Sequence, residues 1–201
     1  MAGLHIAALI TAAGMSSRMG EFKPLLGIGS LSVSQRIIAV FHKAGIRDIV
    51  IVTGYRAEDL ERHLSGEGII FLRNDSYETT EMFDSVCTGL RFLEGKYSRI
   101  LFTPVDIPLF TAETVHTLTA CNAPLAIPVC GGRAGHPVLI ADHLIRPILE
   151  YSGSGGLKGA LSRCGMPAAR IPVNDPGILH DADTPDDYRK LLTYHTRRKS
   201  D

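Results

Sequence analysis

Short apolar runs alternate with amphipathic segments along the chain. Apolar runs of four or five residues predict buried strands at 7–10, 49–52, 69–72, 99–103 and 125–129. Apolar positions three and four residues apart predict helices between them, one carrying Ile37, Val40, Phe41 and Ala44, one at 58–64, and one carrying Phe83, Val86, Leu90 and Leu93. Thr111 and Asp142 are candidate N-caps of two further helices. This alternation predicts an α/β fold with a mostly parallel sheet and helices on both faces.

The segment after the first predicted strand, residues 11–26, has a composition of its own. From Thr11 to Gly20 it holds two alanines, two glycines and two serines, and Arg18 and Lys23 add two cations. Backbone donors and cations at the carboxyl end of a first strand suit a polyphosphate, whose oxygens need donors and whose charge needs neutralising. The segment therefore predicts a nucleoside triphosphate loop, although a solvent-exposed Gly/Ser loop remains an alternative on this evidence alone.

Two familiar phosphate-binding motifs are excluded for this loop. Five residues separate Gly14 from Gly20, where a P-loop has four, and Lys23 does not directly follow the second glycine, so the loop is not a P-loop. The residues after Gly14 do not follow the dinucleotide pattern, and Pro24 interrupts an early helix.

Composition narrows the class of protein. The 201 residues carry no formal net charge, which argues against a general binder of nucleic acid or anionic membranes. No linker divides the chain, so we expect a single domain. The four cysteines, Cys87, Cys121, Cys130 and Cys164, form no CxxC pair, and free thiols are expected. With neither a charged leader nor a run of roughly 20 apolar residues, the chain is expected to be soluble and cytoplasmic.

Two acidic segments are candidate metal sites. Asp106 follows an apolar strand and lies between Pro104 and Pro108, so its carboxylate is held near the same sheet edge as the first loop. A fixed acid facing a triphosphate suits Mg²⁺, although an Asp in a turn is the alternative. In the second segment, 181–188, Thr184 is expected to cap a helix that places Asp186 and Asp187 in its first turn. Asp181 and Asp183 are then left over, and Asp183, which immediately precedes the cap, can point toward a metal.

Five segments together resemble the MobA-like nucleotidyltransferases, especially their molybdenum cofactor cytidylyltransferase branch. They are TAAGMSSRMGEFKPLL at 11–26, EMFDSVCTGL at 81–90, TPVDIPL at 103–109, GHPVLI at 135–140 and DADTPDDY at 181–188. The resemblance implies a Rossmann-like, three-layer α/β/α domain over residues 1–195, followed by a basic tail at 196–201. It also implies Mg²⁺-dependent transfer of CMP from CTP, or another nucleotide, to a phosphorylated small molecule, with release of pyrophosphate.

The same resemblance assigns site residues. Nucleotide binding falls to Thr11, Ala12, Ala13, Gly14, Ser16, Ser17, Arg18, Lys23, Thr103 and Pro104. Arg18 and Lys23 are the implied catalytic groups, and Asp106 and Asp183 the implied metal ligands. The TAAG form, with Ala13 where guanylyl enzymes tend to have glycine, goes with cytidine, because a methyl group narrows the base pocket.

The acceptor is expected to be the terminal phosphate of molybdopterin, which is already anionic and needs alignment more than a general base. Weaker acceptor candidates are His136, which is more often structural in such a position, and Gly156 and Lys158 in a possible loop. The sequence SGSGGLKG at 152–159 lacks the acid that family members often carry there, and Glu81 replaces the usual glycine.

Two other functions stay open at this point. One is a sugar-phosphate or alditol-phosphate nucleotidyltransferase, which shares the loop and the acids. The other is a non-catalytic carrier that delivers molybdenum cofactor to a molybdenum hydroxylase, a function that absence of Lys23 or Asp106 would have favoured. The basic end at 197–199 is expected to be solvated or to begin a linker.

Overall fold

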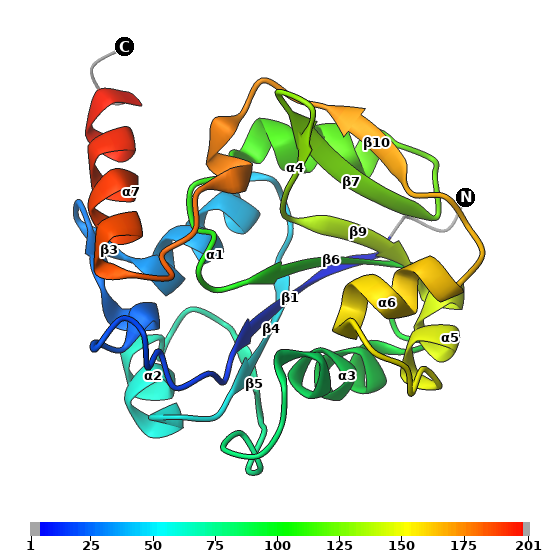
Figure 1. Cartoon of the computed structure of the whole chain (residues 1–201), viewed down its shortest axis with the longest axis horizontal. Coiled ribbons are helices and arrows are strands. Elements are labelled where there is room, and N and C mark those ends of the chain that lie inside the picture. The colour runs from blue at the N-terminus through cyan, green and yellow to red at the C-terminus, as the bar shows by residue number, and fades with distance from the viewer. Residues whose placement is uncertain (1–4, 199–201) are drawn as a thin grey trace.

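The computed structural model describes residues 5–198 and is built on an eight-stranded sheet (Figure 1). Its strands are β1 (Ile6–Ala12), β4 (Asp48–Thr53), β5 (Ile70–Arg73), β6 (Arg99–Pro104), β7 (Leu125–Cys130), β8 (Arg133–Ala134), β9 (Val138–Ala141) and β10 (Ala169–Pro172). The order is β10-β7-β9-β6-β1-β4-β5, with β8 paired to β7. A separate two-stranded sheet joins β2 (Gly27–Ile28) and β3 (Leu31–Ser32).

Helices connect these strands. They are α1 (Val33–Lys43), α2 (Ala57–His63), α3 (Met82–Leu93), α4 (Ala112–Ala120), α5 (Ile145–Leu149), α6 (Gly156–Arg163) and α7 (Pro185–Arg198), with 3₁₀ turns at Lys23–Leu25, Asp142–Leu144 and Pro176–Leu179. No helix in the described part of the chain combines the length and the hydropathy that a membrane crossing requires.

Strand direction decides where the loops meet. β5, β4, β1 and β6 are mutually parallel, and β9 is antiparallel to both β6 and β7, so β7 runs in the same direction as β6. The sheet is therefore mostly parallel, as the sequence predicts. The carboxyl ends of β1, β4, β5 and β6 lie at one edge, which is where ligands bind in sheets of this kind.

Two hydrophobic cores, one on each face of the sheet, hold the layers together. Along β1, Ala8 and Ile10 belong to a core shared with α1, α2, α4 and α7, whereas Ala7 and Leu9 belong to one shared with α3, α5 and α6. This alternation follows from the two-residue period of a strand. The three-layer α/β/α arrangement is therefore confirmed.

Most of the predicted helices and helix starts are confirmed. Ser32 caps α1 by accepting a hydrogen bond from the Gln35 backbone N–H at 3.2 Å, and its own N–H is bound by the Gln35 side chain at 3.1 Å. Thr111 caps α4 and Thr184 caps α7 in the predicted way. The four cysteines are free thiols, as expected.

Two expectations in the second half are wrong. Asp142 does not cap a helix; it begins a 3₁₀ turn, and its carboxylate accepts a hydrogen bond from the Gly95 N–H at 2.8 Å. Gly156 and Lys158 lie in helix α6, not in a loop. Helix α7 continues through Arg198, whose guanidinium donates to the Leu109 carbonyl at 3.0 Å, and residues 196–198 of the expected basic tail are exposed; residues 199–201 lie outside the described part.

Candidate nucleotidyl transfer site

The loop after β1 is folded around Ser16, which adopts the left-handed conformation with φ of 54°. Its carbonyl accepts a hydrogen bond from the Met19 N–H at 2.9 Å, and its hydroxyl accepts one from the Lys23 N–H at 3.3 Å. A non-glycine residue in this conformation is uncommon and is often found at functional sites. The two contacts bring Lys23 back toward the end of β1.

Lys23 meets the two predicted acids at this edge. Its Nζ lies 2.7 Å from Asp183 Oδ1 and 4.0 Å from Asp106 Oδ2, and Arg18 Nη2 lies 3.0 Å from Asp183 Oδ2. The acids come from distant segments, and the Ala182 N–H joins those segments by donating to the Asp106 carbonyl at 3.0 Å. The predicted meeting of amino-terminal cations with two distant acids is confirmed.

The two carboxylates differ in their electrostatic environment. Burial raises the pKa of Asp106 to about 6, although Lys23 opposes the shift. The hydrogen bond from Lys23 instead lowers the pKa of Asp183. Asp106 Oδ1 is buried without a hydrogen-bond partner, a costly arrangement for a carboxylate.

This donor set is compatible with a hard cation. Mg²⁺ is usually held by one or two carboxylates, with water and phosphate oxygens completing its shell. An unpartnered carboxylate oxygen on Asp106 beside a second acid, Asp183, meets that requirement. Among residues 5–198 there is no group of three or more His, Cys, Asp or Glu side chains that could form a site held by protein alone.

A cavity of about 160 Å³ opens beside these charges. Eight of the residues singled out from the sequence line it: Thr11, Ala12, Ala13, Gly14, Ser16, Lys23, Pro104 and Asp106. Ser17 lines a neighbouring hollow with Tyr55 and Arg56. Thr103 is fully buried behind the cavity and its hydroxyl donates to the Pro104 carbonyl, so the structure gives its side chain no place in the cavity wall.

Sequence reasoning missed the opposite wall. Asn74, Tyr77, Thr80 and Ser85 line the same cavity. The Asn74 side-chain amide donates to Thr80 Oγ1 at 2.9 Å and to Ser85 Oγ at 3.1 Å, so the polar groups of this wall are held together. The signal was available, because this polar segment directly follows the predicted strand at 69–72 and strand ends carry ligand sites in such sheets.

Gly54 fixes the position of the Ala13 wall. A Cβ on Gly54 would lie 2.8 Å from the Ala13 carbonyl oxygen and 2.8 Å from Tyr77 Cβ, so only glycine permits this approach. The Tyr55 N–H donates to the same Ala13 carbonyl at 3.1 Å. Ala13 is therefore held with its methyl group in a closely packed wall.

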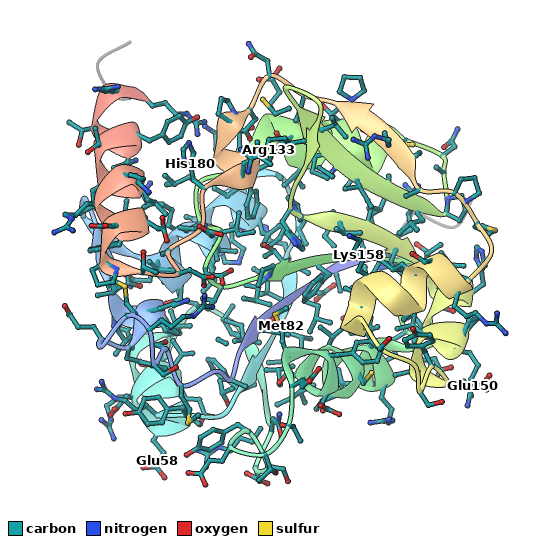
Figure 2. All side chains as sticks on the ribbon, in the orientation of Figure 1. Glu58, Met82, Arg133, Glu150, Lys158 and His180 are labelled. Carbon is teal, nitrogen blue, oxygen red and sulfur yellow. The ribbon has the colours of Figure 1, made fainter. Side chains whose placement is uncertain are left out.

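A larger cavity of about 1140 Å³ adjoins the first, and Glu81 and Met82 line both. All three acceptor candidates, His136, Gly156 and Lys158, line the larger one. Met82 at the start of α3 and Lys158 on α6 are labelled in Figure 2. The remaining wall is largely apolar and includes Phe83, Phe102, Leu125, Ile127 and Leu161.

His136 is held by its surroundings. Its ring packs edge to face on Phe102 with centroids 5.6 Å apart, and Nδ1 lies 3.5 Å from the Phe102 carbonyl. Burial lowers the pKa of His136 to about 4. The imidazole is thus neutral near pH 7 and presents no positive charge to an acceptor.

Comparisons with known proteins agree with this geometry. A family model described as the MobA-like NTP transferase domain matches residues 8–168. The molybdenum cofactor cytidylyltransferase of Escherichia coli (strain K12) is 26% identical over 182 residues, which are 90% of this chain and 92% of that protein. A solved nucleotidyl transferase from Methanothermobacter thermautotroptrophicus matches with a TM-score of 0.84 and 23% identity, covering 98% of this chain and 100% of its own.

Another solved structure, a 4-diphosphocytidyl-2C-methyl-D-erythritol synthase, matches with a TM-score of 0.71 and 17% identity, covering 96% of this chain and 99% of its own. At these identities the two solved structures establish the fold. The Rossmann-like architecture expected from the sequence is thereby confirmed.

Proposed function

The chain belongs to the MobA-like NTP transferase family, and from this premise we propose that it transfers CMP from CTP to the terminal phosphate of molybdenum cofactor. Nucleotidyl transfer is the activity of the family. The choice of CTP and of this acceptor is supported by the 26% identity to the Escherichia coli cytidylyltransferase over most of both chains.

The observation that carries the proposal is the position of Lys23. Its ammonium lies between two acids at the wall of a cavity that β1 and the loop after it line on one side. A cation fixed in this way needs little reorganisation to stabilise charge that develops on an α-phosphate. Arg18, whose side chain is 70% exposed, is free to turn from Asp183 toward the β- and γ-phosphates.

The proposed reaction needs no general base. A phosphate oxygen of the acceptor attacks the α-phosphorus of CTP, and the bond from that phosphorus to the bridging β-oxygen breaks. Pyrophosphate takes the bonding electrons and leaves, and the new phosphoanhydride joins CMP to the acceptor. Asp106 and Asp183 would hold Mg²⁺, which when bound neutralises charge on the phosphates.

The size of the acceptor cavity favours a large acceptor over a small polyol phosphate. About 1140 Å³ with a mostly apolar wall exceeds the space that a four- or five-carbon alditol phosphate fills. A tricyclic pterin bearing one phosphate would use the apolar wall for its rings and Lys158 for its charge. Alditol-phosphate cytidylyl transfer is the second candidate, supported by the shared fold with the methylerythritol enzyme.

A matrix of substrates tests the proposal. Pyrophosphate release is measured with CTP, GTP and ATP, each paired with molybdenum cofactor or with 2C-methyl-D-erythritol 4-phosphate, in Mg²⁺ and in EDTA. We expect release with CTP and molybdenum cofactor, and none in EDTA.

If pyrophosphate is released faster with 2C-methyl-D-erythritol 4-phosphate than with molybdenum cofactor, the alditol phosphate is the better acceptor and the proposed one is wrong. Release that persists in EDTA would remove the metal role of Asp106 and Asp183. If none of the pairs releases pyrophosphate, the carrier function, with delivery to a molybdenum hydroxylase, takes the place of catalysis.

A further inference from the structure

Three cations gather on the sheet face opposite the acceptor cavity. A cavity of about 600 Å³ lies between α1, the start of α4 and the end of α7, helices that are labelled in Figure 1. Arg36, Lys43 and Arg198 line it together with two histidines, and Glu113 is the one acid among its described lining residues. None of these side chains lines the cavity of about 160 Å³ proposed to bind the nucleotide (the nucleotide cavity) or the cavity of about 1140 Å³ proposed to bind the acceptor (the acceptor cavity).

Arg36 is incompletely satisfied. One of its terminal nitrogens donates to the Ile28 carbonyl, but its Nε is buried and has no hydrogen-bond partner. Within residues 5–198 no acid lies within ion-pair distance of it. Burial, and then the charge of Arg198, lower the pKa of Arg36. A partly desolvated cation without a counter-charge is unfavourable for the folded protein.

The nearest buried acid does not supply that counter-charge. Asp175 lies 3.9 Å from Arg198, but its carboxylate already accepts hydrogen bonds from the Thr111 N–H, the Thr114 hydroxyl and the Gly177 N–H. Its charge is used to hold the start of α4 and the turn at 176–179. Within residues 5–198, Arg36 and Lys43 therefore line the cavity without an ion-pair partner, and Glu113 lies outside ion-pair distance of both.

We propose that this cavity is a binding site for a small phosphorylated anion, distinct from the nucleotide cavity. The planar guanidinium of Arg36 offers donors in the fork geometry that phosphate accepts, and Lys43 adds a second charge at the rim. Val40, Leu109 and Phe110 form an apolar wall beside them, so the ligand can carry an organic group. This assignment does not depend on the proposed reaction.

Thermal unfolding of the whole chain tests the site. The wild type, Arg36→Met and Arg91→Met are compared in EDTA, in chloride and in inorganic phosphate at equal ionic strength, with CMP as a second probe. Arg91 is an exposed arginine on α3, so Arg91→Met is the charge-matched control. At ten times the dissociation constant, phosphate should raise the Tm of the wild type and control by about 3–5 °C.

Arg36→Met should lose this rise while its Tm in chloride stays equal to that of the wild type or exceeds it. A larger rise with CMP than with phosphate, lost in Arg36→Met and kept in Lys23→Met, would identify a nucleoside phosphate as the ligand class, and equal rises would identify simple phosphate. Lys23→Met, which removes the cation of the nucleotide cavity, should keep the rise.

An unchanged phosphate effect in Arg36→Met, or its loss in Lys23→Met, would overturn the assignment. If Arg36→Met fails to fold, Lys43→Met provides the test, because that side chain is exposed and its loss should reduce the rise severalfold. A full rise in Lys43→Met would then count against the site.

Discussion

The two adjoining cavities at the carboxyl edge of the sheet differ in size and in the side chains that line them. The nucleotide cavity is small, about 160 Å³, and more than half of its lining residues carry polar or charged side chains, among them Lys23 and Asp106. The acceptor cavity is about 1140 Å³, is mostly apolar, and is assembled from α3, β6, β7, β9 and α6. Glu81 and Met82 form the boundary between them.

The two cavities are therefore suited to different parts of the proposed reaction. Fixed charges at short distances suit the reacting phosphates, because electrostatic stabilisation requires groups that are already in place. A wide apolar wall suits recognition of a bulky group by contact area, with little dependence on any one residue. Substitutions in the small cavity should therefore change turnover, and substitutions in the large one should change mainly the KM for the acceptor.

Lys23→Met should have the largest effect on turnover. Losing a cation directed at developing charge should lower kcat by about 10²–10³-fold. Binding of CTP should weaken only modestly, because Arg18 and the loop N–H groups remain. Turnover is measured by pyrophosphate release and CTP binding by calorimetry. Lys190→Met, at a side chain that is 72% exposed on α7, is the control and should keep wild-type turnover. Near-normal turnover in Lys23→Met would refute its assigned role.

Asp106→Asn and Asp183→Asn should both abolish most activity yet change stability in opposite directions. The pKa of Asp106 is raised to about 6, so in the folded state its charge is unfavourable at pH 7–8. Removing that charge should stabilise the metal-free protein by about 1–3 kcal/mol. The pKa of Asp183 is lowered by Lys23, so its removal should destabilise the protein, by about 0.5–1 kcal/mol at this partly exposed site.

The pH dependence distinguishes the two acids. Asp106 binds a proton more tightly in the folded state than in the unfolded state. The gain in free energy of unfolding from Asp106→Asn should therefore be present above pH 6 and disappear as pH falls toward 4. The loss in free energy of unfolding from Asp183→Asn should also shrink on acidification, because in the wild type the carboxyl of the unfolded state takes up its proton at a higher pH than that of the folded state. Denaturant unfolding in EDTA measures both. Equal signs at pH 8 would contradict the electrostatic difference between the two acids.

The same contrast explains what the sequence could predict. The residues proposed to bind the nucleotide through backbone groups and cations stand together in 11–26, so their composition predicts that side of the site directly. The acceptor side has no such segment. Helix α6 begins at Gly155 and Gly156 and contains Gly159, a sequence with poor helix propensity. It forms because Ala160 and Leu161 are buried in the core shared with α3 and α5, which local sequence does not reveal.

Strands β9 and β10 were missed for a related reason. β9 has four residues and is buried because antiparallel neighbours, β6 and β7, lie on both sides. β10 is an edge strand with alternating exposure that ends at Pro172. Both depend on pairing partners distant in sequence, so their existence is a property of the assembled sheet.

Ala13→Gly should produce a moderate effect confined to nucleotide choice. Removing the methyl group widens the wall that Gly54 and Tyr77 hold in place, which should raise the ratio of GTP to CTP use by about 10-fold. The ratio of kcat/KM for the two nucleotides measures it. Ala12→Gly is the matched control: it adds the same backbone freedom one residue earlier and should lower both rates without changing their ratio. An unchanged ratio in Ala13→Gly would show that the base lies elsewhere.

Lys158→Met should give the smallest effect, on the acceptor alone. Lys158 is exposed at the wall of the large cavity, and an exposed charge pair contributes roughly 1 kcal/mol, so the KM for the acceptor should rise about fivefold. The KM for CTP should not change, because no charge in the small cavity is altered. Arg163→Met, on the same helix but outside the cavity lining, controls for loss of charge from α6. A parallel rise in the KM for CTP would contradict the assignment of the large cavity to the acceptor alone, because a residue of that cavity would then contact the nucleotide.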